Sequence, residues 1–197
     1  MRSREIDTPM LFPDGSDELP PIAGLMYSRE FVTTAEEAEL VTAIDAGHWD
    51  TTWDRRRQSY GKAYGRKSPA DPMPSWGRML ADRIYARVKT PHAFDQMLVN
   101  EYLPGQGIAM HSDYAPFDRA VASLSLLSAC VMDLDHPASA SRHVVLLEPR
   151  SLRVMADEVR YEWRHGIARR KKDRWQVSLL LRRRRVSVTF RRLISEP

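Results

Sequence analysis

Arg185-Val186-Ser187-Val188-Thr189-Phe190-Arg191 is the stretch of sequence that decides the fold. Its polar and apolar residues alternate strictly, and alternate side chains of a β-strand point to opposite faces. One face would therefore carry Val186, Val188 and Phe190, and the other two guanidiniums and two hydroxyls. Two fixed cations on an inward face are costly unless anions neutralise them, so the pattern predicts a strand that binds an acidic ligand.

The two arginines of this strand suit a small dicarboxylate. Arg185 and Arg191 would stand about 20 Å apart along the strand, and their long side chains can lean toward each other. Guanidinium–carboxylate pairs are strong and bidentate. The alternative is an ordinary amphipathic edge strand, with Arg182–Arg185 as a solvent-exposed charged run.

Further strands are predicted upstream, from Phe94 onward. They are Phe94–Tyr102, Val121–Leu127, Ala129–Leu134, Trp175–Leu181, and a hairpin of His143–Leu147 and Leu152–Met155 turning at Glu148–Ser151. Before them, the capping box Thr34-Ala-Glu-Glu37 opens a helix that ends at Gly47, and Pro74-Ser75 opens a second helix. Residues 48–74 are expected to be an irregular loop or hairpin. Two helices followed by about seven strands predict an α+β, mainly β fold, with helices packed on a sandwich or jelly roll.

The chain of 197 residues is long enough for one domain with a core of its own. Residues 1–21 are polar, acidic and proline-containing, which predicts a flexible segment before a single domain over residues 22–197. No apolar run is long enough for a membrane helix, and a signal peptide's apolar core is missing. Cys130 is the only cysteine, which excludes an intramolecular disulfide and a thiolate zinc cluster and favours a small buried side chain. We expect no membrane partner, a cytoplasmic location and a monomer.

The net charge of +4 conceals a strong asymmetry. Residues 1–50 contain three arginines and eleven acidic residues, whereas residues 150–197 contain fifteen basic and five acidic residues. A further basic stretch consists of Arg55–Arg57 with Lys62, Arg66 and Lys67. Such clustering suits a polyanionic partner, and the alternative is a solvated basic face.

His111-Ser112-Asp113 places an imidazole and a carboxylate on one face of a strand or of its end. A second, distant histidine such as His165 would complete the 2-His-1-carboxylate facial triad, which holds Fe(II) and leaves positions open for other ligands. The pair alone is a weak signal, because roughly a third of chains of this size contain one by chance. Asp133 and His136 are a competing pair, but their spacing does not fit one strand face. A lone histidine such as His165 is more often an ordinary core or surface residue.

Taken together, these residues resemble the AlkB family of Fe(II)/2-oxoglutarate-dependent dioxygenases. The similarity runs from about Tyr27 to Leu193 and is densest in five segments: Val99–Gly107, His111–Asp113, Ala122–Leu127, His165–Ile167 and Arg185–Arg191. The joint pattern is Asn-x-Tyr, His-x-Asp nine residues after the tyrosine, a distal histidine and Arg-x₅-Arg. The resemblance implies a double-stranded β-helix, which is a jelly roll, with supporting N-terminal helices.

The resemblance also implies a role for each matching residue. His111, Asp113 and His165 would bind Fe(II), and Asp113 would also count as a catalytic residue. The cosubstrate 2-oxoglutarate would be bound by Asn100, Tyr102, Arg185, Ser187 and Arg191, with Arg185 on its distal carboxylate and Arg191 at the keto-acid end. Many relatives have asparagine where this chain has Ser187, which keeps one donor but reaches less far.

The activity implied is oxidative demethylation of N-alkylated nucleobases in DNA, with O₂ as a reactant and succinate, CO₂ and formaldehyde as products. A base inside a duplex cannot reach such an iron, so a flipped or single-stranded base is expected. Trp53–Lys67 would cover this substrate, with Arg55 and Arg57 on phosphates and Tyr60 or Tyr64 against the base. The alternative for this segment is a surface loop whose aromatic residues pack on the sheet.

A second basic loop, Arg169–Lys172 with Arg174, follows His165 closely and would lie at the rim of the site. Two other functions stay open. The first is the same chemistry on RNA, particularly tRNA, or on a protein side chain. The second is a nucleic-acid-binding jelly roll with a dead site, which is disfavoured because all three metal ligands and both arginines are present.

Overall fold

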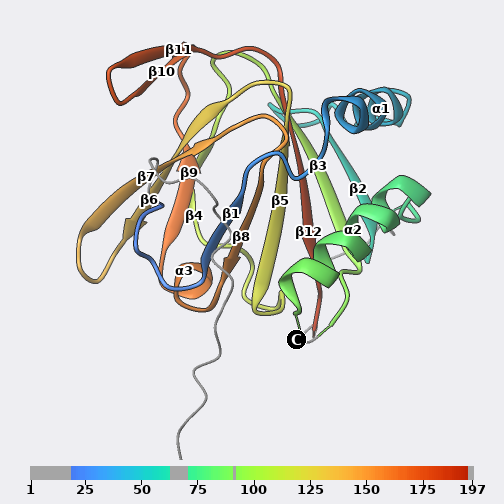
Figure 1. The fold of residues 1–197 in the computed structure, drawn as a ribbon, viewed down its shortest axis with the longest axis horizontal. Coiled ribbons are helices and arrows are strands. Elements are labelled where there is room, and N and C mark those ends of the chain that lie inside the picture. The colour runs from blue at the N-terminus through green and yellow to red at the C-terminus, as the bar shows by residue number, and fades with distance from the viewer. Residues whose placement is uncertain (1–18, 63–70, 91, 195–197) are drawn as a thin grey trace, which may run out of the picture.

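The computed structural model describes residues 19–62, 71–90 and 92–194. Two antiparallel sheets face each other, and two helices cover the outer face of the larger sheet (Figure 1). The larger sheet has the strand order β1-β8-β5-β12-β3-β2, and the smaller has the order β4-β9-β6-β7. This mainly β, two-sheet arrangement confirms the predicted jelly roll with supporting helices.

The elements have the following bounds. The larger sheet contains β1 (Leu25–Ser28), β2 (Arg57–Gly61), β3 (Gln96–Tyr102), β5 (Ala120–Leu126), β8 (Leu152–Ala156) and β12 (Arg185–Arg191). The smaller sheet contains β4 (Ile108–His111), β6 (Cys130–His136), β7 (Ser141–Leu147) and β9 (Arg164–Ile167). A hairpin of β10 (Lys172–Trp175) and β11 (Ser178–Leu181) projects beyond both sheets (Figure 1). The helices are α1 (Thr34–Asp45), α2 (Ser75–Val88) and the short α3 (Asp157–Tyr161).

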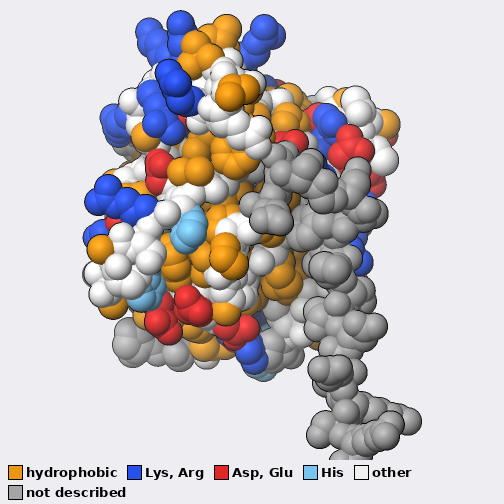
Figure 2. Space-filling model, turned by 60° about the vertical axis from the view of Figure 1, so that its left-hand side comes forward, with side chains coloured by type: hydrophobic (Ala, Val, Ile, Leu, Met, Phe, Trp, Pro, Cys, Tyr) orange, Lys and Arg blue, Asp and Glu red, His pale blue; other side chains and the backbone are white. Residues whose placement is uncertain are grey.

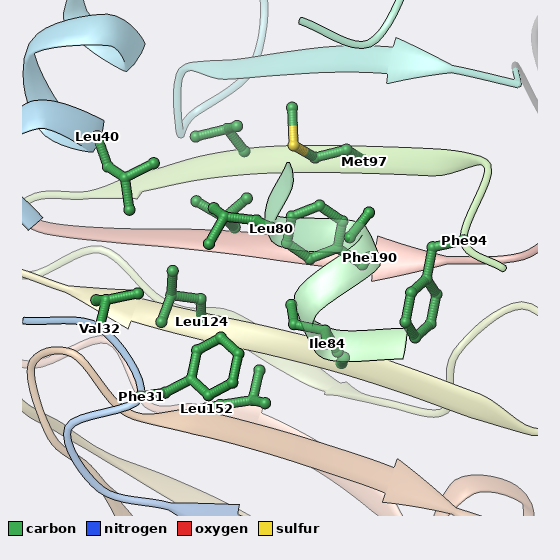
Figure 3. Packing of buried hydrophobic residues seen from close by; sticks show 14 of the residues in the cluster. Phe31, Val32, Leu40, Leu80, Ile84, Phe94, Met97, Leu124, Leu152 and Phe190 are labelled. Atoms are coloured by element: carbon green, nitrogen blue, oxygen red, sulfur yellow. The ribbon is translucent and has the colours of Figure 1, made fainter. Parts of the chain in front are cut away.

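Strand β12 lies inside the larger sheet and pairs with β5 on one side and with β3 on the other. Its apolar residues Val186, Val188 and Phe190 are all 0% exposed, and they belong to the hydrophobic cluster beneath α1 and α2. Figure 3 shows Phe190 near Leu80 and Ile84 in this cluster. The predicted apolar face is therefore confirmed, and the edge-strand alternative is wrong because both edges of β12 are paired.

The start of α1 differs from the prediction by one residue. Thr33 is the N-cap: its hydroxyl accepts a hydrogen bond from the Glu36 amide (3.2 Å), and the Glu36 carboxylate accepts one from the Thr33 amide (2.7 Å). The capping box predicted at Thr34 and Glu37 is thus wrong in register. Glu37 instead accepts a hydrogen bond from the Leu127 amide (2.8 Å), so its carboxylate joins the helix to the loop after β5.

The predicted hairpin of His143–Leu147 and Leu152–Met155 is wrong. Strand β7 pairs with β6 in the smaller sheet, and β8 pairs with β1 and β5 in the larger sheet. The turn between them carries the chain from one sheet to the other, and Arg150 adopts a positive φ of 64° there. The Arg150 carbonyl accepts a hydrogen bond from the Phe31 amide (2.8 Å), which ties this crossover to the segment before α1.

Several short elements were not predicted. Residues 57–61 form β2 inside the stretch expected to be irregular, and β1, β4 and β9 are strands of four residues each. The run Trp175–Leu181 is not one strand, because Gln176 turns with φ of 50° between β10 and β11. Residues 1–18 of the predicted flexible segment lie outside the described residues, and Ile22, just beyond it, is buried. None of the described helices has the length and apolar content needed to span a bilayer.

A second hydrophobic cluster, which includes Met132, Met155, Trp163 and Ile167, draws its residues from both sheets. Cys130 belongs to this cluster and is 2% exposed, as the sequence predicts for a small buried side chain. The inner face of β12 does not join it, because this face carries hydroxyls and guanidiniums. A polar pocket therefore lies where a sandwich would otherwise be filled with apolar side chains.

Candidate metal centre

Pairing of β4 with β9 brings the two predicted histidine ligands together. His111 ends β4 and lies opposite His165 in β9, and their ring centroids are 4.4 Å apart. Asp113 follows β4 by two residues. One ligand atom from each of the three side chains lies within 4.8 Å of the others.

Each of the two histidines can offer a ring nitrogen to a metal ion. Nδ1 of His111 lies 2.8 Å from the carbonyl oxygen of Ala109, and a proton on Nδ1 donated to this oxygen leaves Nε2 free for a metal. His165 is 8% exposed, and its burial and the charge of Arg153 lower its pKa to about 3. His165 is therefore neutral at physiological pH.

Asp113 supplies the negative charge. Its side chain is 5% exposed, and the Arg191 Nη2 atom lies 3.6 Å from its Oδ1 atom. Burial alone would raise the pKa of Asp113, but the charges of Arg191, Arg160 and Arg153 outweigh burial and hold the pKa below its ordinary value. Its Oδ2 atom is buried and has no hydrogen-bond partner among the described residues. Two imidazoles and an ionised carboxylate with a free oxygen fit Fe(II).

Arg160 of α3 fixes the segment that carries Asp113. Its guanidinium is 2% exposed and donates to the backbone carbonyls of Asp113 (3.2 Å) and Tyr114 (2.7 Å). These bonds hold the chain in place just after β4 without using the Asp113 carboxylate. This role could not be predicted from the sequence, because Arg160 lies far from Asp113 along the chain.

The pocket beside the three ligands is lined by every residue predicted to bind the cosubstrate: Asn100, Tyr102, Arg185, Ser187 and Arg191. Arg185 lies opposite Tyr102, and Ser187 opposite Asn100, in the pairing of β12 with β3. The Arg185 guanidinium is 4% exposed and donates from Nη2 to the hydroxyl of Ser125 (2.8 Å). Its Nε and Nη1 atoms have no partner in the described part of the chain, which fits a carboxylate ligand.

Hydroxyl groups form the floor of the pocket between the arginines. The Ser123 hydroxyl lies 2.9 Å from that of Ser187 and 3.0 Å from that of Thr189. These bonds satisfy the short side chains of β5 and β12 where they face each other. Ser187, the residue at which the chain departs from many relatives, therefore belongs to the pocket but already has a partner.

Several pocket residues were not predicted from the sequence. They are Ile108, Val121, Ser123, Met132, Leu147, Arg153, Ile167 and Thr189. Arg153 is the one that carries charge, and it is 6% exposed. A single arginine inside the apolar run Leu152–Ala156 was the signal that could have identified it.

Two of the residues predicted to contact substrate lie near the pocket. Nη1 of Arg55 donates to the Gly107 carbonyl (2.8 Å), and its guanidinium lies 5.2 Å from the centre of the Tyr102 ring. Arg57 lies opposite Asn100 in the pairing of β2 with β3, but its guanidinium contacts Asp50 (3.2 Å) and the Trp53 ring. Arg55 therefore borders the site, and Arg57 is one strand further out.

The structure does not bring Tyr60 to the pocket. Its hydroxyl donates to Oε1 of Gln58 (3.1 Å), and its ring packs edge-to-face against Trp76 of α2. Because three positions separate Arg57 from Tyr60 in β2, their side chains lie on opposite faces of the sheet. For Tyr60 the structure agrees with the alternative of an aromatic residue packed on the sheet. Tyr64 lies outside the described residues.

The β10–β11 hairpin carries an exposed basic face close to the site. Lys172 pairs with Leu181 and Arg174 with Leu179, so these four exposed side chains share one face. Figure 2 shows Lys and Arg gathered at the upper end of the molecule, with hydrophobic side chains between them. The loop before β10 is bound to the loop after β3, where the Gly105 amide donates to the Arg170 carbonyl (3.3 Å).

Comparisons with known proteins agree with this geometry. The family model for the 2OG-Fe(II) oxygenase superfamily matches residues 25–191. An "Alkylated DNA repair protein ALKBH8 homolog" of Arabidopsis thaliana is 32% identical over 89% of this chain and 60% of that protein. The mouse "tRNA (carboxymethyluridine(34)-5-O)-methyltransferase ALKBH8" is 33% identical over 83% of this chain and 27% of that protein.

A "DNA N6-methyl adenine demethylase" of Caenorhabditis elegans is 28% identical over 90% of this chain and 62% of that protein. This chain thus spans less than two thirds of these three relatives. The solved structure of OsALKBH1 covers 89% of this chain at a TM-score of 0.68 and 17% identity, which supports the fold.

Proposed function

This chain belongs to the 2OG-Fe(II) oxygenase superfamily and is an AlkB-like dioxygenase, and we propose from this premise that it oxidatively demethylates N-alkylated nucleobases in DNA. The observation that carries the proposal is the convergence of five side chains on one pocket. His111, Asp113 and His165 lie together as a facial triad, and Arg185 and Arg191 line the same pocket.

Each residue would have a distinct task in this reaction. Bound Fe(II), with 2-oxoglutarate and O₂, supplies the oxidation of a methyl carbon, which leaves as formaldehyde while 2-oxoglutarate becomes succinate and CO₂. His111, Asp113 and His165 would hold the metal. Arg185 would bind the distal carboxylate of the cosubstrate, and Arg191, beside Asp113, would steady the keto-acid end.

The exposed basic face of the hairpin supports a polyanionic substrate. Nucleic-acid binding draws most of its affinity from Lys and Arg contacts to phosphates. Lys172 and Arg174 meet this requirement on a hairpin that begins seven residues after His165. Leu179 and Leu181 beside them offer apolar surface to the sugars or bases of the same strand.

The choice of DNA rests on how much of each relative the chain matches. The two relatives matched over about 60% of their length are named for DNA repair and DNA demethylation. The tRNA-modifying relative is matched over 27% of its length, so its methyltransferase name refers to a protein most of which lies outside the match. Modified tRNA is therefore the second candidate substrate, supported by the similarity to the matched part.

Formaldehyde release from defined substrates tests the proposal. We expect the Fe(II)-loaded protein to act on N1-methyladenine or N3-methylcytosine in single-stranded DNA, less on the same base in duplex DNA, and least on tRNA. Succinate should form in equal amount, and Lys172→Glu together with Arg174→Glu should weaken DNA binding without affecting 2-oxoglutarate binding. Activity on tRNA alone would replace DNA with the second candidate, and succinate formation without formaldehyde on either would contradict demethylation.

A further inference from the structure

Arg153 is a buried cation of the pocket that is neither one of the three metal ligands nor one of the residues predicted to bind the cosubstrate. It lies in β8 opposite Ser123 of β5, so its side chain starts from the inner face of the larger sheet. It lines the same pocket as the metal ligands and is 6% exposed. The pocket lining thus contains three arginines, Arg153, Arg185 and Arg191, and one carboxylate, that of Asp113.

Among the described residues, two nitrogens of the Arg153 guanidinium lack a strong hydrogen-bond acceptor. Nη1 points to the thioether sulfur of Met132, a weak acceptor, and Nε has no partner among the described residues. Burial lowers the pKa of Arg153 to about 10, and the charge of Asp113 only partly opposes this effect. A buried charge left in this state destabilises the fold unless a ligand compensates it.

Arg160 shows what a structural arginine looks like in the same protein. It is also buried, at 2% exposed, but two of its nitrogens donate to backbone carbonyls at 3.2 and 2.7 Å. Arg153 has no such carbonyl partner in the described part of the chain. The difference indicates that the hydrogen-bond donors of Arg153 bind a ligand that enters the pocket.

The charge of Arg185 indicates that the ligand of Arg153 is an anion. Arg153 and Arg185 repel each other, and both have a nitrogen without a partner at the same pocket. The charge of Arg191 already has a partner in the carboxylate of Asp113. An anionic group between Arg153 and Arg185 would remove the repulsion and use the unpaired donors of both.

We propose that Arg153 is a third cosubstrate-binding arginine, which grips the distal carboxylate of 2-oxoglutarate together with Arg185. The inference rests on the proposed cosubstrate site and adds a residue to it from β8. It makes Arg153 a specificity residue, because only a 2-oxoacid with a second carboxylate can use it. A 2-oxoacid without that carboxylate would gain nothing from Arg153.

Two ligands that differ only at the distal end test the assignment. Binding of 2-oxoglutarate and of 2-oxopentanoate to the Fe(II)-loaded full chain is measured by calorimetry without oxygen or nucleic acid. Arg153→Leu should weaken 2-oxoglutarate binding by about 10- to 100-fold, the range for loss of a charge-assisted hydrogen bond, and leave 2-oxopentanoate binding unchanged. Arg153→Lys should recover part of the loss, and Arg87→Leu, at an exposed site on α2, should change neither affinity.

The melting temperature distinguishes a cosubstrate-binding role of Arg153 from a purely structural role. Arg153→Leu should leave the melting temperature of the metal-free protein unchanged or raise it, because it removes an uncompensated buried charge. A lower melting temperature with unchanged 2-oxoglutarate affinity would overturn the proposal, as would an equal loss of affinity for both ligands. Failure to release formaldehyde from nucleic acid, with these affinities as expected, would contradict the proposed substrate and leave the role of Arg153 intact.

Discussion

The two faces of β12 are both buried but have opposite chemistry. Toward α1 and α2, Val186, Val188 and Phe190 are sealed in a hydrophobic cluster. Toward the smaller sheet, Arg185, Ser187, Thr189 and Arg191 are also buried, at 4 to 8% exposed. Burial alone therefore does not distinguish core from site. The helix-side face should stabilise the fold, whereas the pocket-side face holds charges that the fold compensates only in part.

The largest expected effect lies on the pocket side, at the metal. His111→Ala should abolish Fe(II) binding and succinate formation, because the triad loses one of its three ligands. The metal-free protein should melt near the wild-type temperature, since His111 is only partly buried at the end of β4. Metal content, succinate assays and thermal melting measure these effects, with Ser112→Ala between the ligands as the control. Full activity of the His111 variant would contradict the assignment of the iron ligand.

On the helix side, a substitution should lower stability and leave cosubstrate binding intact. Phe190→Ala should lower the free energy of unfolding by about 3–5 kcal/mol, because it leaves a cavity beneath α2. The folded fraction should bind 2-oxoglutarate as the wild type does. Urea unfolding and calorimetry measure the two quantities, with Phe190→Leu as the milder control. Weaker cosubstrate binding with unchanged stability would break the contrast between the two faces.

Arg185 provides the matching test on the pocket side of the same strand. Arg185→Ala should raise the half-saturating 2-oxoglutarate concentration about 100-fold, the equivalent of about 3 kcal/mol for a charged, bidentate pair. Arg183→Ala, an exposed arginine two residues earlier, is the control and should change nothing. An unchanged requirement for 2-oxoglutarate in the Arg185 variant would remove this residue from the cosubstrate site.

A smaller effect is expected from pH. The folded protein holds the pKa of His165 at about 3, far below that of an unfolded histidine, so below about pH 6.5 the unfolded state binds a proton that the folded state does not. The contribution of His165 to the free energy of unfolding is therefore fully present above that pH, and it is lost as the pH falls toward 3. Between about pH 7.5 and about pH 5 the metal-free wild type should lose about 2 kcal/mol more than His165→Asn. Equal losses in urea titrations at several pH values would show that His165 is not buried in its neutral form.

The pocket-side residues were largely predictable because strand periodicity is a local property. Alternation in Arg185–Arg191 separated the two faces of β12, and Asn100 and Tyr102 share a face for the same reason. The link from His111 to His165 was not local, since these histidines meet only through the pairing of β4 with β9. It came from the family resemblance.

What the sequence did not reveal depends on which strand pairs with which. The turn at Glu148–Ser151 has the length of a hairpin turn, but the chain uses it to change sheets. Arg153 was overlooked because its significance depends on this crossover, which directs its side chain into the pocket. Tyr60 was assigned to the substrate as part of the segment Trp53–Lys67, although the pleat of β2 turns its side chain away from the face that carries Arg57.

The place of β12 in the larger sheet also bears on how the protein is made. Among the described strands it is the latest to be synthesised, yet it lies between β5 and β3, so the larger sheet cannot close before residue 191 has been added. Pairings between such distant segments form slowly. A nascent or prematurely ended chain would have His111, Asp113 and His165 but neither arginine of β12. Synthesis of β12 thus decides when these three ligands can meet a bound cosubstrate.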